Sequence, residues 1–412
     1  MIFPDAPHVS LNHARIDRTV TGLLYVEIGI ANSTDDGRPT HYILSVAVAD
    51  NEEPVFTKRI DVISVASFLF AVNSHLLPNG VSQLTFSLLN EAGTVVWTHS
   101  LELTVSNLGA LADSVRESLR RFNSPTVIDG LCDSTHFDYR DEQLKPWFDR
   151  DDADLHIYAR RAEGKMSDAE AELLKSFCLD GYLVLADLLD EDLLRQINAE
   201  LDEAVTKKLE GYEFGSSQRI HQLHEHYPGV RKLWGHPRIL RILSLIFEQP
   251  ARPCQSLTYI FGSQQSAHQD TIHLTPFPAG YMCGVWTALQ DVEPDSGELE
   301  VYKGSHRLPR VYMNDAGCHK IINGDLSEYN SRVVPIWNNM LTNGKFERIV
   351  YRPKKGTVLI WHENLMHGGS VRIDKSLSRR SIVTHNFADG AIAYYDSSGH
   401  VAYMEPLENL PS

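Results

Sequence analysis

The sequence predicts a mainly β chain in two parts: a small antiparallel β-sandwich, then an α+β domain built around a β-sandwich or jelly-roll barrel. Three observations support this fold class. The chain has 412 residues, which is more than one ordinary compact core needs and favours two or three domains. Alternating apolar residues recur through the N-terminal part. After residue 166, helical patterns come first and strand patterns follow, as is typical of α+β domains.

The N-terminal part, residues 1–106, has the two-residue period of half-buried strands, first seen at Leu24, Val26, Ile28 and Ile30. Further runs of this kind are HYILSVAVAD (41–50), SFLFAV (67–72), SQLTFSLL (82–89) and TVVWTHSLELTV (94–105). The turn signals between runs are TDDGRP (34–39), PNG (78–80) and NEAG (90–93). These features predict an immunoglobulin-like sandwich. No catalytic constellation stands out in it, so we expect a binding or assembly module.

A helix and a connector are expected over residues 107–165. Residues 124–165 are polar and acidic with scattered aromatic residues, and we interpret them as an extended connector packed at intervals on a neighbour. Before them, apolar residues recur at spacings of three and four, which predicts a helix with one buried face. We expect this helix to pack the sandwich against the next domain, and the two alternative purposes are to shape substrate access or to build a homodimer. These apolar residues are Leu108, Leu111, Val115, Leu119 and Phe122.

The second domain is expected over residues 166–412. Ser167 and Glu170 form a capping-box pattern for a helix that ends near Cys178. Next come a short apolar strand and a helix within 181–205, and another helix near 236–248. The strand patterns that follow are SLTYIFG, GVWTALQDV, LEVYKGS, TVLIWHE and SIVTHNF. This order predicts the β-sandwich or jelly-roll core.

Composition indicates which partners are disfavoured and in which cellular compartment the chain is expected. The 38 basic and 54 acidic residues give a net charge of −16, which disfavours nucleic acid as a partner. The five cysteines are widely spaced and form no zinc or CxxC pattern, so a reduced, cytoplasmic chain is expected. No signal peptide is recognisable, and no apolar run approaches the ~20 residues that span a bilayer.

Two short segments carry the chemistry: AHQDTIH (267–273) and WHENLMHGGS (361–370). On a strand, His268 and Asp270 would leave the same face and could converge on one ion. His367, which follows the apolar run TVLIW and precedes a glycine pair, could supply a third ligand from an opposing strand. Two imidazoles and one carboxylate form the facial triad that holds non-haem Fe(II). An H-x-D pair alone is a weak signal, so the flanking sequence must show whether these residues form a metal site.

Those surroundings resemble the phytanoyl-CoA dioxygenase family of Fe(II)- and 2-oxoglutarate-dependent oxygenases over about residues 168–390. The quoted matches are the GYLVL leader, HQD, the WTAL strand, SGELEVYKGSH, GTVLIWHENLMHGGS and the following Arg. The resemblance implies a double-stranded β-helix (jelly-roll, cupin-like) as the catalytic domain. It also implies that His268, Asp270 and His367 are the iron ligands. His362 is the nearest rival for the distal ligand, while His273 is expected in the pocket wall and His306 in a structural hairpin.

By the same resemblance, an arginine about a dozen residues after the distal histidine binds the free carboxylate of 2-oxoglutarate. A guanidinium suits that carboxylate because it can bind both oxygens. Arg379 and Arg380 are both candidates, and the family frame favours Arg379. Trp286 is expected beside the cosubstrate, and Arg219 is a further basic candidate for which a solvated surface charge is an equal alternative. The family commonly has H-G-S where this chain has H-G-G-S, which puts the reach of Ser370 in doubt.

The implied activity is a 2-oxoglutarate-dependent dioxygenase that uses Fe(II) and O2 and releases succinate and CO2. The expected reaction is hydroxylation of an unactivated C–H bond of a small molecule, natural product or acyl substrate. Halogenating relatives carry a small residue in place of the carboxylate ligand, so Asp270 favours hydroxylation. The alternative is a catalytically silent jelly-roll scaffold whose β-sandwich has the main role. The sequence does not select among acyl-CoA thioesters, amino acids, phosphonates and natural products as substrate.

Overall fold

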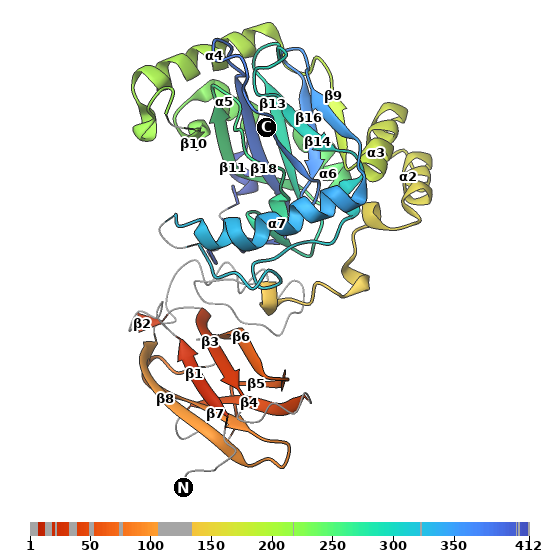
Figure 1. The fold of residues 1–412 in the computed structure, drawn as a ribbon. Helices are drawn as coiled ribbons and strands as arrows, with labels where there is room; N and C mark the ends of the chain where they lie inside the picture. Colours follow the sequence, from red (N-terminus) through yellow and green to blue (C-terminus); the bar gives the residue numbers. More distant parts are fainter. Residues whose placement is uncertain are drawn as a thin grey trace. The chain divides into compact units, whose positions relative to one another are not determined.

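The structure is a computed structural model of the chain (Figure 1). It describes residues 7–12, 19–20, 23–32, 39–48, 53–73, 77–105, 134–216, 218–321, 324–400, 402 and 404–410. Two compact units are present: Met1–His136 with Gly399–Val401, and Phe137–Ser398 with Ala402–Ser412. Across these described ranges, no helix has both the length and the apolar character needed to cross a membrane.

The first unit consists of two β-sheets. The three-stranded sheet has the order β1 (His8–Asn12), β3 (Leu23–Ala31), β6 (Val65–Asn73). The five-stranded sheet has the order β2 (Thr19–Val20), β8 (Val95–Val105), β7 (Gly80–Leu89), β4 (Thr40–Val48), β5 (Phe56–Val62). All neighbouring strands are antiparallel except β2 and β8, which are parallel.

Both sheets contribute to one core, because alternate side chains of each strand point between them. Leu44 of β4 and Phe86 of β7 are fully buried, and they share a cluster with Ile28 of β3 and Phe70 of β6. The unit is therefore a two-sheet sandwich, while its immunoglobulin-like outline stays a prediction. The sequence reading did not identify β5, in which charged residues surround buried Ile60 and Val62 on an edge strand.

Helices precede most of the strands in the second unit. They are α2 (Ala153–Ala162), α3 (Asp168–Asp180), α4 (Glu191–Thr206), α5 (Pro228–Trp234), α6 (Pro237–Phe247) and α7 (Ser327–Gly344). The capping box is confirmed, since Ser167 Oγ accepts from the Glu170 backbone N–H and the Glu170 carboxylate accepts from the Ser167 backbone N–H. The sequence reading identified neither α5 nor α7.

The segment before α3 differs from the extended connector that we expected. Residues 153–162 form the helix α2, and a 3-10 turn spans Trp147–Asp149. The expectation of packing at intervals holds, because Trp147, Phe148 and Ile157 are buried in the core of the second unit. The structure thus groups residues 137–165 with the second unit. The helix expected over 108–122 lies outside the described residues.

The second unit contains a six-stranded and a three-stranded antiparallel sheet and a two-stranded ribbon. The large sheet has the order β10 (Ile220–His221), β11 (Ala251–Tyr259), β18 (Ser381–Ala388), β13 (Met282–Ala288), β16 (Val358–His362), β9 (Tyr182–Leu185). The small sheet has the order β15 (Arg348–Tyr351), β14 (Leu299–Tyr302), β17 (His367–Gly369). Strands β12 (Thr275–Phe277) and β19 (Ile392–Tyr394) form the ribbon.

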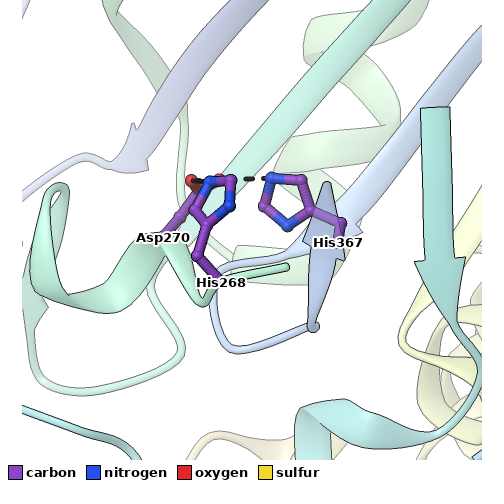
Figure 2. Close-up of side chains that lie close together, drawn as sticks. All are labelled: His268, Asp270 and His367. Carbon is purple, nitrogen blue, oxygen red and sulfur yellow. Dashed lines mark ion pairs between the residues drawn. The ribbon is translucent and has the colours of Figure 1, made fainter. Parts of the chain in front are cut away.

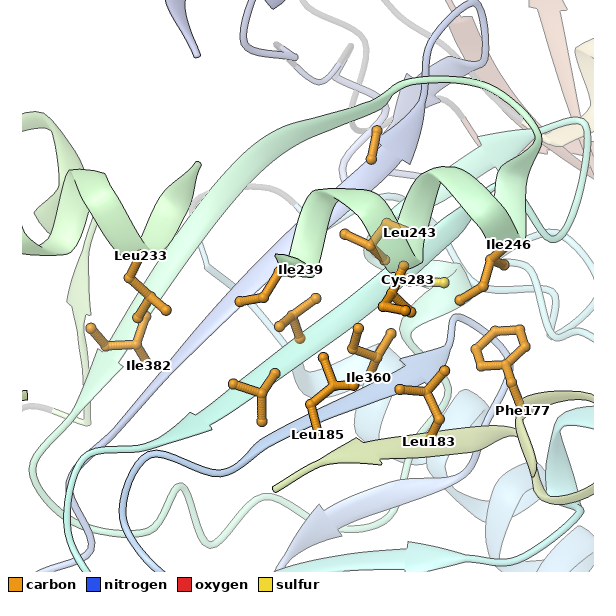
Figure 3. Packing of buried hydrophobic residues seen from close by; sticks show 14 of the residues in the cluster. Phe177, Leu183, Leu185, Leu233, Ile239, Leu243, Ile246, Cys283, Ile360 and Ile382 are labelled. Atoms are coloured by element: carbon orange, nitrogen blue, oxygen red, sulfur yellow. The ribbon is translucent and has the colours of Figure 1, made fainter. Parts of the chain in front are cut away.

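The two faces of the large sheet bury different layers. On one face, Leu183 of β9, Cys283 of β13 and Ile360 of β16 pack against helices, with Leu243 of α6 above them (Figure 3). On the other face, large side chains meet residues of the small sheet in a second cluster. That cluster includes Trp286, Leu359, Trp361 and Val383 of the large sheet and Leu299 and Val301 of β14. The inner face, between the two sheets, holds the candidate site.

Candidate active site

The two segments with the predicted ligands meet through one isolated β-bridge. The backbone N–H of His268 donates to the His367 carbonyl at 2.9 Å, and the His367 N–H donates back at 3.1 Å. Asp270 begins a 3-10 turn, Asp270–Ile272, so the H-x-D motif does not lie on a regular strand as we expected. The bridge and the turn nevertheless point all three side chains at one another.

The three side chains form a buried cluster (Figure 2). One potential ligand atom from each of His268, Asp270 and His367 lies within 4.8 Å of the others. Asp270 Oδ1 is 3.6 Å from His268 Nε2 and 3.7 Å from His367 Nε2. No other group of three or more His, Cys, Asp or Glu residues in the described part of the chain meets the same distance condition.

Hydrogen bonds determine which ring nitrogens face the cluster. His268 Nδ1 lies 2.8 Å from the Ser266 carbonyl, and His367 Nδ1 lies 2.9 Å from the Leu365 carbonyl. A carbonyl can only accept, so each Nδ1 carries a proton, and Nε2 is the ring nitrogen of each histidine that faces the cluster. Burial also lowers the pKa of His367 to about 4, so this imidazole is neutral at neutral pH. Two imidazoles of this orientation, with Nε2 facing a common volume, suit a divalent metal.

The carboxylate of Asp270 is oriented by a tryptophan. Trp361 Nε1 donates to Asp270 Oδ2 at 2.7 Å, while Oδ1 faces the two histidines. Burial would raise the pKa of Asp270, but His367, His268 and His385 outweigh it and hold the pKa below its usual value. Asp270 is therefore an anion, with one oxygen held by Trp361 and the other directed at the His268 and His367 side.

A second tryptophan supports the H-x-D segment from α7. Trp337 Nε1 donates to Gln269 Oε1 at 2.9 Å, and Gln269 Nε2 donates to the Pro309 carbonyl at 3.0 Å. The middle residue of the motif therefore points away from the cluster and ties the segment to two distant parts of the chain. These contacts fix the backbone between His268 and Asp270 through the side chain of Gln269.

The cluster opens into a cavity of about 840 Å³ inside the second unit. Arg379 lies in its wall, 3% exposed, with its guanidinium carbon 5.5 Å from the Trp286 ring centre. Burial lowers the pKa of Arg379 to about 10, so it stays charged at neutral pH. Within the described residues, Arg379 Nε and Trp286 Nε1 are buried without a hydrogen-bond partner. A buried cation with unused donors suits an anionic ligand.

Comparison with known proteins agrees with this arrangement. Residues 177–380 match the family described as phytanoyl-CoA dioxygenase (PhyH). This match identifies a phytanoyl-CoA dioxygenase-family domain within residues 177–380. Members of the family depend on Fe(II) and 2-oxoglutarate, the cofactors expected from the sequence.

Curated relatives cover part of the chain. Phytanoyl-CoA dioxygenase domain-containing protein 1 of Rattus norvegicus is 33% identical over 202 residues, which are 46% of this chain and 62% of that protein. Peroxisomal phytanoyl-CoA dioxygenase of Bos taurus is 28% identical over 141 residues, 33% of this chain and 37% of that protein. The chain thus covers less than two thirds of the length of these relatives.

Solved structures give weaker similarity. The 2-oxoglutarate-dependent carbocyclase SnoK from nogalamycin biosynthesis is 18% identical with a TM-score of 0.44, covering 57% of this chain and 88% of that one. EctD from S. alaskensis with bound Fe is 19% identical with a TM-score of 0.43, covering 54% of this chain and 77% of that one.

The other histidines considered in the phytanoyl-CoA dioxygenase-family domain lie outside the three-residue cluster. His362 is fully buried with its Nε2 3.4 Å from Asp149 Oδ1, so it does not take part in the cluster. His273 lines the cavity, and His306 lies in the 3-10 turn Ser305–Arg307 with Nε2 3.2 Å from the Cys178 carbonyl.

The remaining candidates for cosubstrate binding differ in whether they line the cavity. Arg380 points away from the cavity and pairs with Asp202 at 2.6 Å, while Arg379 lines it. Arg219 also lines the cavity. Ser370 is not among the lining residues, and its hydroxyl donates to Glu298 Oε2 at 3.0 Å. The structure therefore gives no support for a contact between Ser370 and the cosubstrate.

Three residues at the site were missed in the sequence reading. Trp361 and His385 lie on strands β16 and β18, and strand alternation could have placed them on the inner face with Leu359 and Val383. Trp337 had no such signal, since α7 contains Pro335 and several poor helix formers.

Proposed function

We propose that this protein is an Fe(II)- and 2-oxoglutarate-dependent dioxygenase that hydroxylates an unactivated C–H bond of a small molecule. The observation that carries the proposal is the convergence of His268, Asp270 and His367 at the wall of a cavity that also holds the buried Arg379. Bound Fe(II) and 2-oxoglutarate would supply the oxidising chemistry, with O2 as co-substrate and succinate and CO2 as products. An anaerobic Fe(II) titration and an assay of succinate release test the proposal.

The protein's own groups bind and orient these cofactors. His268 Nε2, His367 Nε2 and Asp270 Oδ1 would hold the metal, because these three atoms face the same small volume. Arg379 would bind the distal carboxylate of 2-oxoglutarate, with the Trp286 N–H as a second donor in the same wall. The presence of Asp270 favours hydroxylation, since halogenating relatives lack this carboxylate.

A catalytically silent scaffold is the alternative function. Such a scaffold does not require two imidazoles oriented toward an oriented carboxylate, or a buried guanidinium that has no ion pair with an acidic residue in the described part of the chain. Iron-dependent turnover of 2-oxoglutarate by the purified protein separates the two functions. Its absence, with the metal bound, would favour the scaffold.

Several finer features belong to the same proposal. The two facing sheets of the second unit would be the halves of a double-stranded β-helix, the jelly-roll fold implied by the sequence. We also propose a cytoplasmic location, which the free thiols of Cys178, Cys254, Cys283 and Cys318 support.

Trp361→Phe should weaken Fe(II) binding about 10- to 100-fold, because loss of an outer hydrogen-bond partner to a ligand costs this much. The substitution keeps an aromatic ring but removes the N–H that orients Asp270. Fe(II) affinity measured by anaerobic titration checks this expectation. Trp234→Phe is the matched control, since the buried indole N–H of Trp234 has no hydrogen-bond partner among the described residues and Trp234 does not line the cavity. Equal loss of affinity in both variants would contradict a positioning role for Trp361.

Removal of residues 1–105 should leave Fe(II) binding and slow, substrate-free turnover of 2-oxoglutarate detectable. The core of the sandwich is made of residues between Val26 and Val105, whereas the cavity is lined by residues between Gln218 and Ser398. Metal binding and succinate release by the truncated chain check this domain boundary. A truncated chain that is insoluble or cannot bind Fe(II) would show that the sandwich completes the catalytic core.

A further inference from the structure

The cavity contains a second cation for which the cofactors give no obvious partner. Arg219 immediately precedes β10, and its guanidinium donates to the side-chain oxygen of its neighbour Gln218. Arg219 forms no ion pair of 4.0 Å or less with an acidic residue in the described ranges, and it lines the cavity. Arginines in surface positions usually find such partners or full solvation, so a half-buried, acid-free guanidinium in a cavity is available to a ligand anion.

Arg219 and Arg379 lie in different surroundings within this cavity. Both guanidinium carbons are near the Tyr259 ring centre, at 5.6 and 5.9 Å, but only Arg379 also stacks over Trp286. The positive charge of Arg219 acts on His221, His273 and His385, whereas Arg379 lies against Trp286. The two cations can therefore bind separate anions. A cavity of about 840 Å³ is large for 2-oxoglutarate alone and accommodates a second small molecule.

The rest of the wall shows which charges a second ligand can carry. Asp270 is the one acidic side chain among the described residues that line the cavity, and it belongs to the proposed metal site. Near Arg219, the wall is neutral and hydrogen-bonding: His273 lies 2.9 Å from the Tyr329 hydroxyl and 3.0 Å from the Ser397 hydroxyl. No carboxylate other than Asp270 lines this cavity in the described part of the chain, so a ligand ammonium group has no acidic side chain to pair with, whereas a ligand anion can pair with Arg219.

We propose that Arg219 binds a carboxylate or phosphate of the primary substrate, so that the substrate is a small anion without a cationic group in this cavity. The inference rests on the proposed oxygenase function and deepens it by naming the substrate class. It also assigns Arg219 to the substrate instead of to 2-oxoglutarate. Binding by both guanidinium nitrogens would give a preference for anionic over neutral ligands of the same shape.

The test measures binding of three probes of similar size: benzoate, phenyl phosphate and benzamide. Isothermal titration calorimetry is performed with the full chain, first alone and then with Fe(II) and 2-oxoglutarate under anaerobic conditions. At least one anionic probe should bind ten or more times tighter than neutral benzamide. Arg219→Gln should remove that preference and leave the affinity for 2-oxoglutarate unchanged. The stronger of the two anionic probes then indicates a carboxylate or a phosphate.

Arg380→Gln is the matched control, because Arg380 pairs with Asp202 outside the cavity, and it should retain the anion preference. Arg219→Lys should retain part of it. The proposal is overturned if benzamide binds as tightly as both anions, or if Arg219→Gln weakens 2-oxoglutarate binding tenfold and leaves the probes unaffected. Failure of the oxygenase function is distinguishable, since it would appear as absent Fe(II) and 2-oxoglutarate binding in the unsubstituted chain, whereas the probes are also measured without them.

Discussion

Alanine in place of His268, Asp270 or His367 should abolish Fe(II)-dependent turnover of 2-oxoglutarate. Each substitution removes one of three donor atoms that lie within 4.8 Å of one another. Replacement of outer hydrogen-bond partners of a metal site already costs about 10- to 100-fold in affinity, so loss of a ligand itself should exceed about 100-fold. Fe(II) affinity and succinate release, measured on each purified variant, check the expectation.

His362→Gln is the matched control for the distal ligand. His362 is buried five residues before His367 in the same motif, but it faces Asp149 and not the cluster. This variant should bind Fe(II) with unchanged affinity, even if the loss of its contact with Asp149 lowers the melting temperature. Circular dichroism of every variant shows whether the fold is retained. Normal iron binding by His367→Ala together with its loss in His362→Gln would show that the distal ligand is wrongly assigned.

Arg379→Lys should raise the KM for 2-oxoglutarate about 10- to 100-fold. Lysine keeps the positive charge but has no planar fork for the two carboxylate oxygens. A hydrogen bond to a charged group contributes about 1.5–3 kcal/mol, and each 1.4 kcal/mol corresponds to a factor of ten. Because Arg379 is 3% exposed and its Nε has no partner among the described residues, the variant cannot recover this loss through water. Initial rates over a range of 2-oxoglutarate concentrations give the KM.

Arg380→Lys provides the comparison, since the neighbouring arginine pairs with Asp202 away from the cavity. Its KM for 2-oxoglutarate should remain within about twofold of the unsubstituted protein, because exposed ion pairs contribute little. The opposite pattern, a large effect at Arg380 and a small one at Arg379, would mean that the start of β18 is shifted by one residue.

Local patterns allowed much of the second unit to be predicted. The capping box of Ser167 and Glu170 was recognisable because its two hydrogen bonds join residues three apart. Strands β13, β16 and β18 were recognisable from short apolar runs between turn signals. The helix α7 was missed because Pro335 and its asparagines obscure the helical pattern, and its burial against the rest of the unit outweighs weak propensity.

The order of residues along the chain determined the candidate ligands and the resemblance of residues 177–380 to the phytanoyl-CoA dioxygenase family, because H-x-D, the distal histidine and Arg379 stand in a recognisable sequence context. Only the tertiary structure decided how they act together. The bond from Trp361 to Asp270 joins residues 91 apart, and that from Trp337 to Gln269 joins residues 68 apart. Such contacts form when the hydrophobic burial of whole sheets and helices offsets the entropy of closing long loops. No local pattern specifies that outcome, and the acid-free position of Arg219 follows from it in the same way.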